Sequence, residues 1–154
     1  MSRVRESSAW SLQEIESFLD TCVIPVRLAC ITNSGAPVVC SLWYQYGDGA
    51  LWCATQKTAR VARYLQNHPL CGFEVAPDPL PYRGVRGQGR VTLSEARGPE
   101  VLAQLIDRYL GDGDSQFARW LMARASNEVA IRIVPTWLTS WDFAARMGGA
   151  RADG

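Results

Sequence analysis

The sequence has very little of the residue types on which many catalytic sites depend. Among its 154 residues there is one histidine, His68, and one lysine, Lys57, beside 15 arginines. A device that pairs a serine or cysteine with histidine would have to use His68, and no nucleophile motif accompanies that residue. The formal net charge is only +1, whereas a general nucleic-acid binder usually carries a basic surplus. We therefore expect no nucleic-acid partner.

Long hydrophobic runs are also missing. No run of about 18 apolar residues occurs, so the sequence predicts no transmembrane helix and no membrane partner. Residues 1–8 have no apolar core and do not look like a signal peptide, which favours a cytoplasmic protein. An apolar content of 47% and a charged content of 20% are ordinary for a globular protein. The length fits a single domain, residues 1–154, in which residues 1–9 and 144–154 look loose.

The five cysteines form no C-x-x-C pair and are odd in number. Zinc sites normally show close pairs of cysteine or histidine, so we expect no metal site. Cys30, Cys40, Cys53 and Cys71 each lie inside an apolar run. This placement favours reduced thiols that are buried as small hydrophobic side chains.

Hydrophobic periodicity and turn signals predict a mainly β chain with four helices. The strand-like segments are residues 26–32, 37–46, 50–54, 70–75, 83–94 and the pair 128–134 and 136–143, with Pro135 between the last two. A capping box, Ser11 followed by Glu14, begins a helix that ends near Asp20. Further helices are predicted at about 57–67, 98–110 and 114–125. About six strands joined mostly by hairpins indicate an antiparallel barrel with helices over its ends.

The segment from Cys53 to Leu65 carries the strongest functional signal. An apolar run passes without proline or glycine into a helical pattern whose first turn holds four polar residues: Thr55, Lys57, Thr58 and Arg60. A helix N-terminus offers unpaired N–H groups and a partial positive charge, so hydroxyls and cations beside it suit a phosphate. Solvated basic residues and ordinary threonine capping give the same pattern, so spacing alone leaves both interpretations open.

Two further segments give this corner a context. Residues 27–44 hold two strand-like runs around Gly35-Ala36-Pro37, and residues 129–143 hold the closing strands, ending in Trp141-Asp142-Phe143. With residues 55–69 between them, they resemble in order and spacing the FMN-binding split-barrel family, the pyridoxamine 5'-phosphate oxidase-like proteins and their deazaflavin-dependent relatives. The resemblance implies a six-stranded antiparallel Greek-key split β-barrel.

The resemblance also implies a site. The FMN phosphate would be held at the corner by Thr55, Lys57, Thr58 and Arg60, next to Ala54. The flavin ring would face the backbone of the second strand, at Val39, Cys40, Ser41 and Leu42. Family members are generally homodimers with the cofactor at the interface, and by position the second subunit would contribute Tyr82, Arg83 and Trp141. No residue stands out as a catalytic acid or base, which flavin chemistry often does not need.

The sequence departs from the family pattern in ways that keep several functions open. Val61 stands where a lysine usually follows the arginine of the corner, and Val38-Val39 stands where the oxidases carry an arginine. Their C-terminal arginine and histidine motif is not recognisable after Trp141. The first hypothesis is a flavin-dependent oxidoreductase acting on an unknown small molecule. The second is a non-catalytic module, or one that binds a deazaflavin, haem or another tetrapyrrole. The third is a structural barrel whose tryptophans only pack a core.

Overall fold

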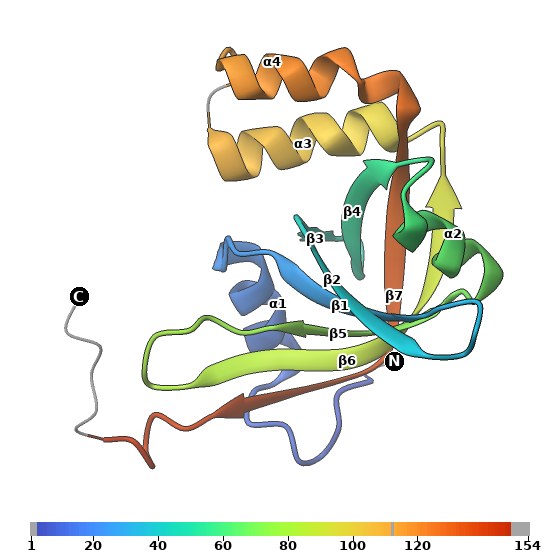
Figure 1. Cartoon of the computed structure of the whole chain (residues 1–154). Coiled ribbons are helices and arrows are strands. Elements are labelled where there is room, and N and C mark those ends of the chain that lie inside the picture. Colours follow the sequence, from blue (N-terminus) through green and yellow to red (C-terminus); the bar gives the residue numbers. More distant parts are fainter. Residues whose placement is uncertain (1–2, 112, 149–154) are drawn as a thin grey trace.

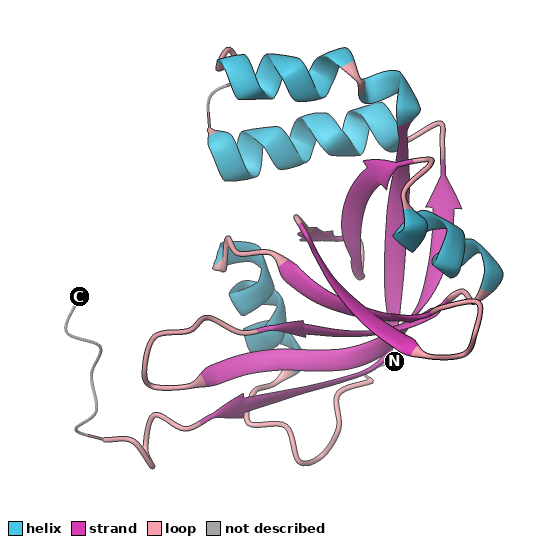
Figure 2. Cartoon of the chain, viewed as in Figure 1, coloured by secondary structure: helices cyan, strands magenta, loops and turns pink. Residues whose placement is uncertain are grey.

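The computed structural model describes residues 3–111 and 113–148 and shows one curled antiparallel sheet with four helices around it (Figures 1 and 2). The seven strands are β1 (Val26–Ile31), β2 (Pro37–Leu42), β3 (Gln45–Gly47), β4 (Ala50–Gln56), β5 (Leu70–Val75), β6 (Arg83–Ser94) and β7 (Glu128–Asp142). The helices are α1 (Leu12–Thr21), α2 (Arg60–Asn67), α3 (Gly98–Leu110) and α4 (Gln116–Ala123), with a short 3₁₀ turn at Ala125–Asn127.

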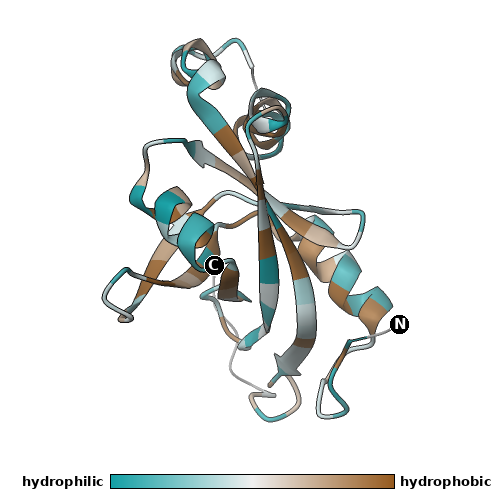
Figure 3. Cartoon of the chain, turned by 90° about the vertical axis from the view of Figure 1, so that its right-hand side faces the viewer, coloured by the Kyte–Doolittle hydropathy of each residue, from teal (hydrophilic) through white to brown (hydrophobic). Residues whose placement is uncertain are grey.

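The strands lie in the order β2-β1-β5-β6-β7-β4-β3, and each paired strand is antiparallel to its neighbour. β7 therefore joins the two parts of the sheet, because β6 pairs along one of its edges and β4 along the first part of the other. The sheet curls into a half-barrel, with β2 and β3 as its two edge strands (Figure 1). Figure 3 shows hydrophobic segments where the strands cross at the centre of the molecule.

The core forms because every second residue of the strands points into the curl. In β1, Val26, Leu28 and Cys30 are buried, whereas Arg27 is exposed. α1 adds Ile15 and Leu19 from its apolar face to the same cluster. This alternation is the period-2 signal that predicted the strands.

The expected count of six strands is wrong, because the structure has seven, and two of the predicted strand regions also have other bounds than expected. The predicted strand 37–46 breaks at Tyr44, whose buried hydroxyl donates to the carbonyls of Leu19 (2.8 Å) and Cys22 (2.7 Å). The predicted closing pair is instead one strand that continues through Pro135. Pro135 lies opposite Gly89, where the β6–β7 register shifts; a bulge of this kind accommodates a residue that cannot donate a backbone hydrogen bond.

The predicted loose arm at residues 1–9 is bound to the sheet over its described part. The N–H of Arg5 donates to the Leu138 carbonyl at 2.9 Å, and the N–H of Ala9 donates to the Ser140 carbonyl at 3.1 Å. The arm therefore covers the part of the β7 edge that β4 does not reach. At the other terminus, residues 144–148 form a turn, while residues 1–2 and 149–154 lie outside the described part of the chain.

α3 and α4 cover one part of the outer face of the sheet, over β4 and the first half of β7 (Figure 1). Val101 and Leu105 of α3 pack on Trp52 and Ala130. The approach is closest at Gly98, where a Cβ atom would lie 2.1 Å from the Glu128 carbonyl oxygen. None of the described helices has the length and apolar character needed to cross a membrane.

Candidate functional site

A corner joins the end of β4 to the start of α2. The backbone N–H of Lys57 donates to the Asn127 carbonyl at 2.8 Å, which keeps Lys57 outside the helix and starts α2 three residues later than predicted. The N-cap is Ala59, and no side chain caps the helix. Thr58, predicted as part of the first helical turn, precedes the cap and is exposed.

The uncapped first turn has the chemistry of an anion site. The N–H groups of Arg60, Val61 and Ala62 have no acceptor one turn earlier in a helix, and α2 provides no side-chain substitute. These N–H groups carry the partial positive charge of the helix dipole. Arg60 and Thr58 are exposed beside them, so an arriving anion would meet N–H donors, a guanidinium and a hydroxyl together.

Lys57 is the other cation of the corner, and it already has a carboxylate partner. Its ammonium lies 3.6 Å from a carboxylate oxygen of Glu95, a residue that directly follows β6. The Lys57 side chain is 36% exposed and that of Glu95 is 71% exposed. Ion pairs in such solvated places contribute about 0–1 kcal/mol. A phosphate could therefore replace Glu95 beside Lys57 at little cost.

Val61 occupies the position at which the family pattern described above has a lysine. Its side chain is half-buried and packs against the main hydrophobic core. A lysine at this place would have to turn its ammonium away from that core. Of the residues predicted for the corner, Lys57 and Arg60 are therefore the two that carry positive charge.

The predicted ring-facing strand, β2, divides its four candidate residues between two faces. Cys40 and Leu42 point inward and pack against the main core, and burial raises the pKa of the Cys40 thiol to about 11. Val39, on the other face, is 66% exposed. Ser41 is exposed too, and its hydroxyl accepts a 2.6 Å hydrogen bond from Arg27. Ala54 and Thr55, near the end of β4, are half-buried.

Val39 borders a shallow hollow of about 530 Å³ on the outer face of the sheet. Gly72 of β5 and Gln88 of β6 also line it, and Trp137 of β7 forms another part of its wall. Gly72 has no side chain to fill this space, which makes the face concave. This part of the outer face is the one that α3 and α4 leave open.

The remaining three candidates lie at the far end of β6 and β7. Arg83 pairs with Asp142 in the register, and Gly84 pairs with Trp141. The guanidinium of Arg83 lies 5.9 Å from the centre of the Phe18 ring. Tyr82 is 49% exposed. Arg83 and Trp141 thus belong to the last pairs of the β6–β7 ladder, and this end of the two strands lies away from α2 (Figure 1).

Tyr82, Arg83 and Trp141, here called the far group, do not lie near the corner within one chain. The end of β6 at Ser94 pairs with Ala130, which also pairs with Ala54 at the corner. Arg83 is at the other end of the 12-residue strand, about 36 Å away along the backbone at roughly 3.3 Å per residue. Any site that uses both groups must take one of them from a second copy.

Sequence reasoning missed two acidic residues at the corner. Glu95 is 38 positions from Lys57 along the chain, so no local pattern reveals their contact. Glu128 is 5% exposed and accepts a 2.9 Å hydrogen bond from the side-chain amide of Gln56. Burial raises the pKa of the Glu128 carboxyl. A glutamate at the head of the apolar run 128–134 is the signal that could have identified this second residue.

Of the four cysteines expected to be buried, Cys30, Cys53 and Cys71 are buried and Cys40 is half-buried. All five cysteines are free, and three of them are buried. Burial raises the pKa of the Cys71 thiol to about 12, so this thiol is a poor nucleophile. No group of three potential metal-ligating side chains occurs in residues 3–111 and 113–148. His68 is exposed at the C-terminal cap of α2.

Comparison with known proteins identifies solved structures that share this fold. No family model matches the chain, and no curated protein matches it. Among solved structures, the conserved hypothetical protein Rv2991 from Mycobacterium tuberculosis superposes with a TM-score of 0.78 and 24% identity, over 99% of this chain and 96% of that one. An F420 reductase superposes with a TM-score of 0.69 and 22% identity, over 80% of this chain and 94% of that one.

The protein has the split-barrel fold of the pyridoxamine 5'-phosphate oxidase-like proteins. The fold predicted from the resemblance is thereby confirmed, apart from the number of strands. HutZ, a haem storage protein from Vibrio cholerae, has the same fold, with a TM-score of 0.60 and 15% identity over 85% of this chain and 91% of that one. An F420 reductase and a haem storage protein thus share this fold, and the fold alone does not choose between such functions.

Proposed function

We propose that this split barrel binds a flavin or deazaflavin cofactor and uses it to oxidise or reduce a small molecule. The observation that carries the proposal is the corner between β4 and α2. There an uncapped helix start lies beside Lys57 and Arg60, in the segment that resembles the phosphate-binding part of the family.

The corner fits a phosphate in three respects. Backbone N–H groups of α2 have no side-chain acceptor, and the exposed Arg60 lies next to them. Lys57 is fixed at its backbone by the bond to Asn127, and its side-chain partner Glu95 is exposed and readily replaced. Thr58 adds a hydroxyl. In this proposal the main-chain donors position the phosphate and the two cations balance its charge.

The proposed contacts of the flavin ring follow from the position of β2 at the edge of the sheet. The backbone of Val39 to Leu42 would face the ring, since Val39 and Ser41 leave this edge strand open to solvent. The cofactor supplies the hydride chemistry when it is bound. The protein contributes position, a partly dry surface and the charges of the corner.

A homodimer is the second part of the proposal. The far group of Tyr82, Arg83 and Trp141 is too distant from the corner to act in the same subunit. The open outer face carries exposed apolar side chains, Val39 at 66% and Leu70 at 52%. A second copy packed on this face would cover them and could bring its far group to the cofactor of the first.

A haem-binding function is the main alternative, because HutZ shares the fold. A haem iron needs an axial ligand such as histidine or a thiolate. The only histidine, His68, is exposed at the end of α2, and burial raises the pKa of the Cys30, Cys40 and Cys71 thiols. These properties favour a flavin-type cofactor over haem.

The decisive experiment is a binding titration of the purified full chain with FMN, coenzyme F420 and haem, followed by absorption and fluorescence. We expect saturable binding of FMN or F420, and at least a tenfold loss of affinity when Lys57→Ala is combined with Arg60→Ala. Arg119→Ala is the matched control, because Arg119 is exposed on α4. Unchanged affinity in the double variant would refute the phosphate assignment, and a Soret band without flavin binding would refute the cofactor class.

A further inference from the structure

α4 presents aromatic side chains to solvent. Phe117 is 51% exposed and Trp120 is 54% exposed. The helix packs inward through Ala118 and Leu121, which share a hydrophobic cluster with Leu102 and Ile106 of α3. α4 therefore lies on the far side of α3 from the sheet and forms the outer layer of the molecule there (Figure 1).

The two exposed rings are supported by other aromatic side chains. Phe117 and Trp120 stack with their ring centres 6.2 Å apart and their planes at 15°. Phe117 also packs edge-to-face with Trp43, at 6.4 Å between the ring centres, and Trp43 stacks on Tyr109 of α3 at 5.0 Å. Because these neighbours already restrict the two rings, little side-chain freedom is lost when the rings bind a partner.

The charges beside the rings are mainly positive. α4 and its C-cap carry two arginines, Arg119 and Arg124, and no acidic residue. Asp114 is the one carboxylate in residues 113–127. Both arginines are exposed, and the Arg124 guanidinium lies 4.4 Å from the centre of the Trp120 ring. Phe117, Trp120 and Arg124 share one side of the helix, because they are three and four residues apart.

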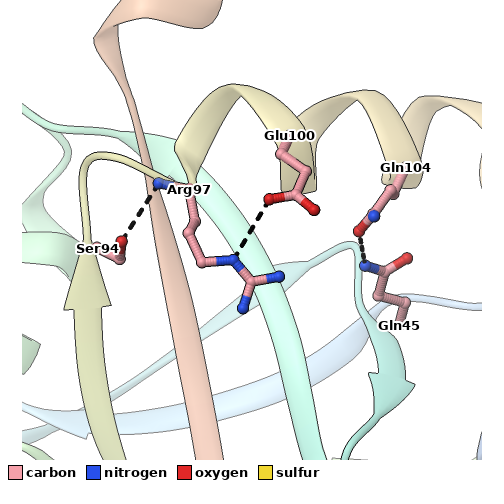
Figure 4. A network of polar contacts seen from close by, with 5 residues as sticks. All are labelled: Gln45, Ser94, Arg97, Glu100 and Gln104. Atoms are coloured by element: carbon pink, nitrogen blue, oxygen red, sulfur yellow. Dashed lines mark hydrogen bonds and ion pairs between the residues drawn. The ribbon is translucent and has the colours of Figure 1, made fainter.

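The polar side chains of α3 are paired within the protein. Glu100 accepts a hydrogen bond from Nε of Arg97 at 3.4 Å, and the side chain of Gln104 accepts one from the Gln45 amide (Figure 4). These contacts join α3 to its own N-cap residue and to β3. Among the described residues of α3 and α4, the exposed large apolar side chains all belong to α4.

We infer that α4 docks on the surface of an anionic lipid membrane, with Phe117 and Trp120 among the headgroups and the two arginines beside the lipid phosphates. Arginine next to tryptophan and phenylalanine on one helix is the composition of helices that lie in a membrane interface. A convex outer helix can lie along a bilayer without the groove that peptide partners usually require. Tryptophan suits the lipid–water boundary, because its ring is apolar and its N–H is polar.

This contact is independent of the proposed cofactor site. It needs no membrane-spanning segment, because the helix would lie in the plane of the surface. It also leaves the corner between β4 and α2 free, since that corner uses other residues. Near an anionic surface, each arginine is expected to change the affinity by about fivefold.

The test is co-sedimentation of the full chain with vesicles of phosphatidylcholine alone, or of phosphatidylcholine mixed equally with phosphatidylglycerol. We expect binding at least tenfold tighter to the anionic vesicles. The double variant Phe117→Ser with Trp120→Ser is expected to lose at least tenfold in that affinity, and so is Arg119→Gln with Arg124→Gln. Met122→Ser is the matched control, because Met122 is 39% exposed on α4 but lies on the other side of the helix from Trp120.

Hydrogen exchange of the unsubstituted protein tests the same surface if the aromatic variant fails to fold. Anionic vesicles are expected to slow amide exchange in residues 116–124 more than elsewhere. No vesicle binding, equal binding to both kinds of vesicle, protection confined to other segments, or an equal loss in Met122→Ser would each overturn the inference. A dimer in light scattering that the aromatic variant loses, without vesicle binding, would assign this surface to a second copy instead.

Discussion

The contact between α3 and the end of α1 gives a prediction whose size can be worked out. Arg108 reaches from α3 to three carbonyl oxygens near the C-terminus of α1. Its guanidinium donates to Asp20 at 2.7 Å, to Leu19 at 3.0 Å and to Cys22 at 3.2 Å. The Tyr44 hydroxyl donates to two of the same carbonyls, those of Leu19 and Cys22. The perturbation is Arg108→Met, which keeps an apolar stem over the Tyr44 ring but removes the donors.

The expected loss of unfolding free energy is about 2–3 kcal/mol. Hydrogen bonds from a charged donor contribute about 1.5–3 kcal/mol each, but only the Asp20 carbonyl loses its single side-chain donor. The other two carbonyls still share the single hydrogen of the Tyr44 hydroxyl, so their share of the loss is smaller. A cation at a helix C-terminus adds about 0.3–1 kcal/mol. Such a loss corresponds to a melting temperature lower by about 5–10 °C for a chain of this size.

Urea unfolding followed by circular dichroism measures this loss, with Arg119→Met as the control on an exposed face of α4. Tyr44→Phe alone is expected to cost about 1 kcal/mol, because Arg108 still serves both shared carbonyls. The double variant leaves those carbonyls without either donor, so its loss should exceed the sum of the single losses by about 1 kcal/mol. A loss below about 0.5 kcal/mol in Arg108→Met, or simple additivity, would refute the shared-carbonyl argument.

Three further predictions concern other parts of the fold. Gly98→Ala places a methyl group 2.1 Å from the Glu128 carbonyl and should cost more than about 2 kcal/mol in urea unfolding, whereas Gly47→Ala, with no atom within 4 Å, should change little. Burial raises the pKa of Glu128 in the native state above 4.5, so the native state binds more protons than the unfolded state. The contribution of this carboxyl to stability therefore falls as pH rises from its unfolded to its native pKa. That fall should be missing when the stability of Glu128→Gln is measured against pH. Val39→Asp should convert the proposed dimer to a monomer in light scattering, and a wild-type monomer, or an unchanged dimer in the variant, would contradict the proposed interface.

Sequence patterns located the elements whose signals are local. The capping box at Ser11 and Glu14 forms as predicted and begins α1. α3 occupies the predicted residues, and its left-handed C-terminal cap is Gly111, with φ 68°. In these places side-chain and backbone preferences within a few residues decide the structure, so the sequence alone carries the information.

Tertiary contacts decided the features that sequence reasoning got wrong. The run from Pro37 to Tyr46 reads as one strand, but at Tyr44 the backbone N–H and carbonyl bond the Tyr109 hydroxyl of α3, and the Tyr44 hydroxyl bonds carbonyls of a distant segment. The partner of Lys57 could not be predicted either, because Glu95 reaches it only through the pairing of β6 with β7 and of β7 with β4. Helix and strand periods carry no information about such pairings.

The place of β7 in the strand order has a consequence for how the chain can fold during synthesis. Without β7, the order β2-β1-β5-β6-β7-β4-β3 separates into one four-stranded ribbon and the β3–β4 hairpin. An isolated two-stranded hairpin is marginally stable at best in water. β7 leaves the ribosome after the other six described strands, and its residues also form the ladder for the N-terminal arm. The β3–β4 hairpin, and the corner that follows it, must therefore wait until β7 has been made before they have a stable partner in the sheet.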